Sequence, residues 1–344
     1  MPKQIFDYMK ETSRESDEYT LKCLESLKQE GKDIFDYTNH LPHLRNRVGR
    51  DLAIPKARNT LARLIYESLS TKNWKKIIPI LSFIELSTIA TYVLDDIIDN
   101  QEQRQGDEST WKKFGSNEGI IAAGLQQVVS FKQLESLDLP NSEKLKVFGL
   151  ATDMWKKLWI GEGFNEEMKE GTSEEEYIKR CCDLNGIMFD TIAQISAICA
   201  GGNNKQIRIA SKIGNNYGMA VMVRNDLADL LEKLRKHSKA LSKKPFEDIR
   251  KGIWTYPVIH FMRSDAQEQD KESFKKILGK QCAPRYGNFL YTLLENAGSI
   301  HATLDLVTKF KEKTNQEIEK LPAGKSRDLL FELTDLLENL RMYT

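Results

Sequence analysis

Two short aspartate clusters, each set directly after an apolar run, are the feature that most constrains the fold of this chain. The first is Asp95–Asp99 after Thr91–Leu94, and the second is Asn225–Asp229 after Met219–Val223. On a helix, the first and last polar residues of each cluster lie one turn apart on the same face. Ionised carboxylates are rarely buried without a compensating cation. The sequence therefore predicts a helical bundle in which two acidic faces meet around bound cations.

The chemistry of the clusters indicates Mg²⁺. Carboxylate and amide oxygens are hard ligands that suit Mg²⁺, which keeps part of its water shell and usually bridges to substrate phosphates. Neither cluster has the loop glycine or the bidentate glutamate of a calcium-binding EF-hand. A solvated acidic helix face is the alternative, but Ile89–Leu94, directly before the first cluster, contains few polar residues. We therefore predict a site that handles a diphosphate.

Composition excludes several other classes of protein. The 344 residues are 40% hydrophobic and 29% charged, which is typical of a soluble globular protein. The net charge of +1 gives no argument for binding nucleic acid or membranes. Five cysteines form no CxxC and no metal-ligand spacing, so we expect reduced thiols and a cytoplasmic location.

No targeting or transmembrane segment is predicted. Met1–Lys10 is mixed polar, unlike a signal peptide. The most apolar stretch, Ile77–Leu94, is interrupted by Pro79 and Glu85 and ends directly on carboxylates. We expect a buried core helix there rather than a membrane span.

Apolar residues recur at helical spacing along almost the whole chain, as in the stripe Leu61, Leu64, Ile65 and Leu69. No run alternates with period two between turn signals, so no strands are predicted. The pattern predicts a single all-α domain over residues 1–344 with ten or more helices. Residues 1–50 are charge-rich, and we expect them to form peripheral N-terminal helices.

Both clusters also resemble motifs of a known family. Ile84–Gly106 is similar to the first aspartate-rich motif of the trans-isoprenyl diphosphate synthases (polyprenyl synthetases), and Gly218–Asp229 is similar to their second. Other landmarks follow in order: Gly161-Glu162, Gly201-Gly202 and Asp248–Ile259. The resemblance implies the all-α isoprenoid synthase (class I terpenoid synthase) bundle, with the clusters facing each other across a deep central cavity.

The resemblance also implies the roles of the cluster residues. Family members bind three Mg²⁺ ions, which hold the diphosphate of an allylic isoprenyl substrate and stabilise it as it leaves. The metal ligands implied here are Asp95, Asp99, Asn225 and Asp229, with Asp96 and Asp226 as supporting carboxylates of the metal site. Asp95 and Asp99 are then catalytic, together with Arg224, which immediately precedes the second cluster and is placed to sense the diphosphate.

Several cations expected from the resemblance are missing. Chain-elongating members bind a second diphosphate, that of isopentenyl diphosphate, through basic residues. Where those are expected, this chain has Ile54–Asn59 without the glycine, Thr88 for a histidine, Gln105 for an arginine, Asn185-Gly186 for a Lys-Thr pair, and Ile253 for a lysine. A second diphosphate would be poorly neutralised without them. The losses at Asn185 and Ile253 also concern the allylic diphosphate. Substitute cations for the remaining diphosphate are Arg104, Arg224, Lys179, Arg180 and Arg250.

These losses predict a divergent, terpene-synthase-like member. The expected reaction is ionisation of a farnesyl or geranylgeranyl diphosphate, followed by cyclisation or elimination to a terpene, or by prenyl transfer to a non-isopentenyl acceptor. One alternative is a chain-elongating trans-prenyltransferase with an isopentenyl site rebuilt from Lys56, Arg58 and Arg104. Another is a non-catalytic regulatory subunit of a prenyl synthase. A homodimer is expected because this fold usually pairs through its helices.

Small residues before the first cluster predict a deep substrate pocket. In the family, the residues one and two turns before the first aspartate line the pocket floor. Here they are Ser87, Thr88, Ala90 and Thr91, with Tyr92 on the adjacent face. Phe189 is a candidate for stabilising a carbocation and Met222 for lining the same pocket. A core role is the alternative for the aromatic residue.

Overall fold

Helices dominate the computed structural model, which describes residues 3–29, 56–104, 107–165, 168–230 and 246–338. In these residues the only strands are β1 (Gln103–Arg104) and β2 (Asp107–Glu108), which have two residues each and form an antiparallel hairpin. The α-helices are α1 (Lys3–Glu25), α4 (Ala57–Leu69), α5 (Ile78–Ile98), α6 (Thr110–Phe114), α7 (Ser116–Glu135), α8 (Asn141–Asn165), α9 (Glu174–Cys181), α10 (Ile187–Cys199), α11 (Asn204–Leu230), α13 (Glu247–Lys251), α14 (Tyr256–Arg263), α15 (Glu268–Ile277), α16 (Gly287–Asn296), α17 (Ser299–Ile318) and α18 (Lys325–Asp335). The predicted all-α class is confirmed.

Shorter helical segments complete the fold. A π-helical segment, η3 (Cys182–Gly186), joins α9 to α10. The 3-10 segments are η1 (Ser26–Gln29), η2 (Trp74–Ile77), η4 (Ala283–Tyr286) and η5 (Leu336–Glu338).

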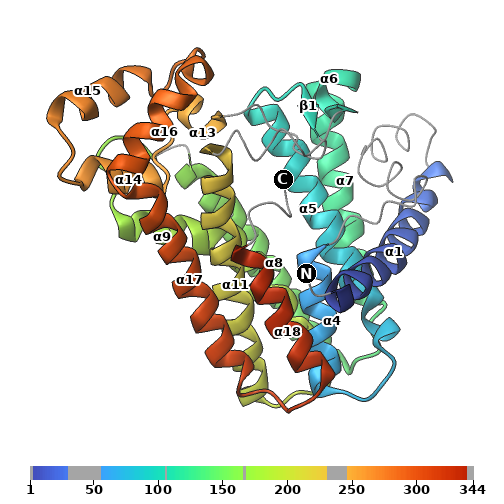
Figure 1. Ribbon diagram of the computed structural model, residues 1–344. Coiled ribbons are helices and arrows are strands. Elements are labelled where there is room, and N and C mark those ends of the chain that lie inside the picture. The colour runs from blue at the N-terminus through green and yellow to red at the C-terminus, as the bar shows by residue number, and fades with distance from the viewer. Residues whose placement is uncertain (1–2, 30–55, 105–106, 166–167, 231–245, 339–344) are drawn as a thin grey trace. The chain divides into compact units, whose positions relative to one another are not determined.

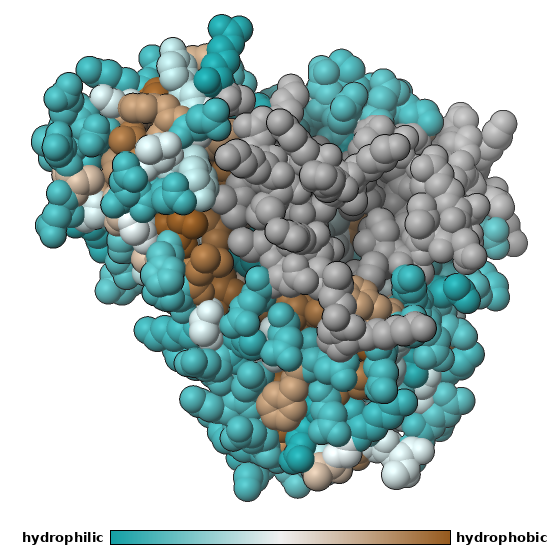
Figure 2. Space-filling model, in the orientation of Figure 1, coloured by the Kyte–Doolittle hydropathy of each residue, from teal (hydrophilic) through white to brown (hydrophobic). Residues whose placement is uncertain are grey.

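The chain divides into two compact units. The first unit is Met1–Thr152, Thr191–Ser211 and Ile318–Leu333, and the second is Asp153–Asp190, Lys212–Glu317 and Thr334–Thr344. The assignment of the whole chain to a single domain stays a prediction. Coloured residues on the face shown in Figure 2 are mostly hydrophilic, as expected from the high content of charged residues.

Helix α5 is the central helix of the first unit. It runs beside α7 and also packs against α1 and α4 (Figure 1). Pro79 lies in its first turn, where proline is tolerated, and the helix ends at Ile98, two residues before Asn100 adopts a φ of 51°. Among the described residues, Trp74–Ile98 has the length and composition to cross a membrane, but 72% of its most apolar window is buried. This burial favours the predicted core helix.

Helix α1 docks on α4 and α5 through a mixed face. Ile5, Met9 and Leu24 are fully buried, and polar residues occupy the face between them. At one side Arg63 of α4 lies between the rings of Tyr8 and Trp74, 3.9 Å from each centroid. Residues 30–50 of the predicted peripheral segment lie outside the described residues.

In the second unit, α11 lies unusually close to the η3 and α10 segment. A Cβ on Gly218 would lie 2.7 Å from the Asn185 carbonyl oxygen, and one on Gly214 would lie 2.3 Å from the Phe189 carbonyl oxygen. Two glycines one turn apart therefore bring the two backbones into direct contact. This packing places the second cluster, at the end of α11, beside α9.

We expect Gly218→Ala to destabilise the protein by about 2 kcal/mol, because its methyl group would meet backbone atoms that cannot rotate away. The matched control is Gly149→Ala on α8, where nothing lies within 4 Å of the added carbon. We expect that control to be neutral or slightly stabilising. Urea unfolding of both variants measures the difference, and equal unfolding free energies would contradict the close packing.

Candidate active site

The first cluster divides between two environments. Asp95, in the last turn of α5, and Asp99, directly after the helix, are partly exposed, whereas Asp96 is buried. The Nε of Arg104 donates to both Asp96 oxygens at 2.8 and 2.9 Å, and its Nη2 lies 2.6 Å from Oδ1. Burial disfavours the charge of Arg104, but the bonds and charge of Asp96 outweigh it and raise the arginine pKa. Asp96 is therefore neutralised within the protein, and the other two carboxylates stay partly exposed.

The chain beyond α5 positions Arg104. The amide of Gln101 donates to the Asp96 carbonyl at 2.8 Å, and the Trp111 indole donates to the Gln101 carbonyl at 2.8 Å. The β1–β2 hairpin then returns Arg104 over the ring of Tyr92, 4.6 Å from its centroid. This places Arg104, predicted to bind diphosphate, beside the metal-binding candidates of the first cluster.

The second cluster shows the same division in the second unit. Asn225 is exposed, whereas Asp226 is buried. One oxygen of Asp226 accepts hydrogen bonds from the Tyr177 hydroxyl at 2.8 Å and from Arg180 Nη1 at 3.0 Å. Burial, followed by the charge of Asp226, raises the pKa of Tyr177 well above its usual value, so the phenol stays a neutral donor.

The remaining carboxylate, Asp229, is buried beneath the returning chain. Its side chain accepts from the amide of Asp248 at 3.2 Å, and its carbonyl accepts from the amide of Phe246 at 3.3 Å. The Nη2 of Arg224 donates to the Asn225 side-chain oxygen at 2.9 Å. The start of α13 therefore covers the end of the predicted metal-binding face.

Sequence reasoning left Tyr177 without a role and treated Arg180 only as a further substitute cation. They lie three residues apart on α9 and so share one helix face. That spacing was the available signal, but it does not name Asp226 as their partner. The other predicted diphosphate ligands have local partners: Lys179 pairs with Asp183 at 2.9 Å, and Arg250 donates to Gln281 at 3.2 Å.

The predicted pocket residues divide between the units. Ser87 lies 3.3 Å from Ser130 of α7, while the hydroxyls of Thr88 and Thr91 bond to backbone carbonyls of α5 itself. In the second unit, Phe189 packs against Tyr217 with ring centroids 5.2 Å apart, and the Asn185 amide donates to Met222 Sδ at 3.6 Å. Ala90 is fully buried in α5. Pocket depth and substrate chain length stay predictions.

The donor set fits Mg²⁺. The implied ligands are all oxygen donors, and in the first cluster two of them are partly exposed one turn apart. Across the described ranges, no three His, Cys, Asp or Glu side chains gather at one point that could hold a metal. Each cluster alone is thus incomplete, as expected of a Mg²⁺ site completed by water and phosphate oxygens. The meeting of the two clusters stays a prediction.

Comparison with known proteins identifies the family of this chain. A sequence model described as Polyprenyl synthetase matches residues 55–320. The geranylgeranyl diphosphate synthase of Sulfolobus acidocaldarius is 28% identical over 59% of this chain and 61% of that protein. IDS-like terpene synthase 1 of Melampsora lini is 24% identical over 72% of this chain and 74% of that protein. The chain spans only 55–61% of the length of the first curated relatives.

A solved structure shares the fold. The geranylgeranyl pyrophosphate synthetase of Pyrococcus horikoshii matches with a TM-score of 0.83 and 25% identity, covering 97% of this chain and 98% of that one. The predicted isoprenoid synthase fold is confirmed.

Replacing Arg180 tests the role of the buried pair. We expect Arg180→Met to destabilise the protein by about 3–5 kcal/mol, because it removes the cation that neutralises Asp226. The buried carboxylate would then keep the neutral Tyr177 hydroxyl as a hydrogen-bond donor. Its neighbour gives a control: Lys179 is exposed, and Lys179→Met should cost less than about 0.5 kcal/mol. Thermal and urea unfolding compare the two, and similar losses would contradict this account of Asp226.

Proposed function

We propose, from the premise that this chain belongs to the polyprenyl synthetase family, that it is a Mg²⁺-dependent chain-elongating prenyltransferase. It would condense an allylic isoprenyl diphosphate with isopentenyl diphosphate. The observation that carries the proposal is the partly exposed pair Asp95 and Asp99, set beside a carboxylate that Arg104 already neutralises. The names of most relatives favour this alternative over cyclisation, which the missing cations had suggested. A cytoplasmic location stays a prediction.

The protein's own residues would divide the work of ionisation. Asp95, Asp99, Asn225 and Asp229 would hold Mg²⁺, which supplies positive charge to the leaving diphosphate. Arg104 and Arg224 would add fixed cations, each placed within or beside a cluster. Apolar side chains before both clusters would keep water from the allylic cation.

The acceptor diphosphate would use the cations at the start of α4. Lys56 occupies the N-cap position of this helix, and Arg58 follows in its first turn. Lys56 also lies 2.7 Å from Glu85 of α5, three residues before Thr88, which stands where the resemblance places a histidine. These residues lie together in the first unit, which supports a rebuilt acceptor site there.

Terpene formation is the second candidate, because several cations expected of a chain-elongating member are missing. Two of these positions, which also concern the allylic diphosphate, lie in the second unit. Asn185, where a lysine is expected, donates to the Met222 sulfur, and Ile253, in place of another lysine, is buried. The Melampsora relative carries a terpene synthase name. Gln105, a third such position, lies outside the described residues.

A product assay separates these functions. With Mg²⁺ and geranyl, farnesyl or geranylgeranyl diphosphate, we expect longer prenyl diphosphates only when isopentenyl diphosphate is added. Hydrocarbon or alcohol from the allylic substrate alone, unaffected by isopentenyl diphosphate, would contradict chain elongation and establish a terpene synthase.

Replacing the exposed carboxylates tests whether the chain is itself catalytic. We expect Asp95→Ala and Asp99→Ala each to lower kcat by about 100-fold or more, because each removes charge that holds the metal. Asp138→Ala is the control, since that aspartate is exposed and forms a surface ion pair with Lys76. Full activation of a partner synthase by both cluster variants would instead favour a regulatory subunit.

We also propose a homodimer formed through α7 and the start of α8. Ile121 and Val128 on α7 and Leu145 on α8 are 49%, 67% and 75% exposed, although all three are apolar. Ile121 and Val128 lie two turns apart, with Gly124 open between them. Such a patch on two neighbouring helices can pair with a second copy of itself about a two-fold axis.

Charge placed in this patch should separate the subunits. We expect Val128→Glu to shift the protein toward monomer in light scattering coupled to size-exclusion chromatography, because the carboxylate would be buried at the interface. The control is Lys132→Glu one turn further along α7, where the side chain is already charged and exposed. A wild-type protein that is monomeric at micromolar concentration would contradict the proposed dimer.

A further inference from the structure

Lys56, the first cation of the proposed acceptor site, is held between two carboxylates. Its ammonium donates to Asp17 of α1 and lies 2.7 Å from Glu85 of α5. All three side chains are buried, with 8%, 2% and 9% of their surface exposed. Asp17 lies outside the region matched by the family model, which begins at residue 55.

A row of polar contacts places Asp17 at Lys56. Ser13 accepts from the Lys56 amide at 3.2 Å, Ser16 accepts from Asn59 at 2.8 Å, and Thr20 donates to Ser82 at 3.0 Å. Residues 13, 16, 17 and 20 share one face of α1. The helix therefore presents its carboxylate to Lys56 by many independent contacts.

The carboxylates that hold Lys56 compete with an anionic ligand for it. Asp17 and Glu85 both contact the same ammonium, so a diphosphate would meet carboxylate oxygens already bound there. In a buried site such charges act strongly, because little water screens them. An acceptor diphosphate that uses Lys56 must displace Asp17 from it or bind against the repulsion of that carboxylate.

We propose that Asp17 sets the affinity of this protein for its acceptor diphosphate by competing for Lys56. This inference rests on the proposed function, because it assigns Lys56 to the acceptor site. Binding of the acceptor is thereby linked to the docking of α1. The allylic diphosphate, which belongs to the metal-binding clusters, is outside this competition.

Asp17→Asn tests the competition. We expect its dissociation constant for isopentenyl diphosphate, measured by titration calorimetry without an allylic substrate, to fall about tenfold, which is about 1.4 kcal/mol. Its KM for isopentenyl diphosphate in the elongation assay should fall similarly, with the allylic KM unchanged. Lys56 keeps Glu85 as a partner in this variant, so its charge is not left alone.

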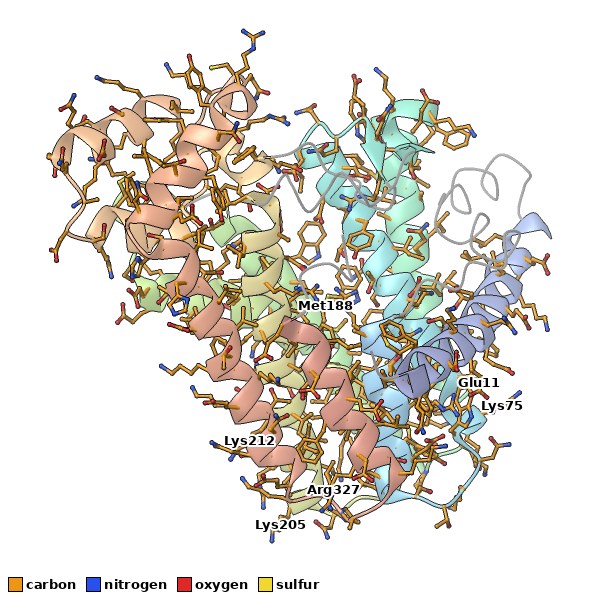
Figure 3. The ribbon with its side chains drawn as sticks, in the orientation of Figure 1. Glu11, Lys75, Met188, Lys205, Lys212 and Arg327 are labelled. Carbon is orange, nitrogen blue, oxygen red and sulfur yellow. The ribbon has the colours of Figure 1, made fainter. Side chains whose placement is uncertain are left out.

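Glu11→Gln is the matched control. Glu11, labelled in Figure 3, also lies on α1 and pairs with Arg63 of α4 at 2.9 Å. The change removes the same charge from the same helix without touching Lys56, so we expect wild-type affinity for isopentenyl diphosphate. Asp17→Glu keeps a carboxylate at this position and should keep the weak binding of the wild type. Melting temperatures check that all three variants are folded.

The outcomes separate this inference from the proposed function. Equal or weaker binding of isopentenyl diphosphate by a folded Asp17→Asn, or no measurable binding by any variant, would overturn the competition. If Asp17→Asn binds isopentenyl diphosphate more tightly but no variant elongates a prenyl chain, the competition is supported and only the proposed chain elongation is overturned. Equal tightening by Glu11→Gln would show a general charge effect and would also overturn a specific role for Asp17.

Discussion

A carboxylate that is removed from water needs a cation, and in both aspartate clusters an arginine supplies it. Arg104 binds Asp96 in the first unit, and Arg180 binds Asp226 in the second. Because an unpaired buried charge costs several kcal/mol, these two contacts determine how each cluster is presented. They hold the middle carboxylate inside and leave the flanking residues of the first cluster, and Asn225 of the second, toward solvent. The predicted metal site depends on this division.

The arginines are placed by quite different local structures. Arg104 comes from a two-residue hairpin that follows α5 and stacks on a ring of that same helix. Arg180 comes from α9, which leads into the η3 and α10 segment that Gly214 and Gly218 bring into backbone contact with α11. Two unrelated packing solutions thus satisfy the same electrostatic requirement, which supports a functional reason for keeping both clusters acidic.

The sequence alone predicted the helical class and the buried α5, and it placed Asp95 and Asp99 one turn apart, because these depend on local spacing and hydrophobicity. It did not predict that Asp229 lies beneath α13, or that Tyr177 binds Asp226, since both contacts join distant segments. The lost cations favoured cyclisation, whereas the names of several relatives favour chain elongation. A missing residue shows which contact has gone, whereas a replacement such as Lys56 gains its meaning only from its neighbours, Asp17 and Glu85.

The central proposal is that the two clusters serve one Mg²⁺–diphosphate site. Electron paramagnetic resonance can count the Mn²⁺ ions bound in place of Mg²⁺ when inorganic diphosphate is added to wild type, Asp95→Ala and Asn225→Ala. The account predicts that the wild-type protein binds more than one ion together with diphosphate and that either substitution abolishes this joint binding. If each variant instead kept the ions of its unchanged cluster and bound diphosphate with wild-type affinity, this result would contradict a shared site.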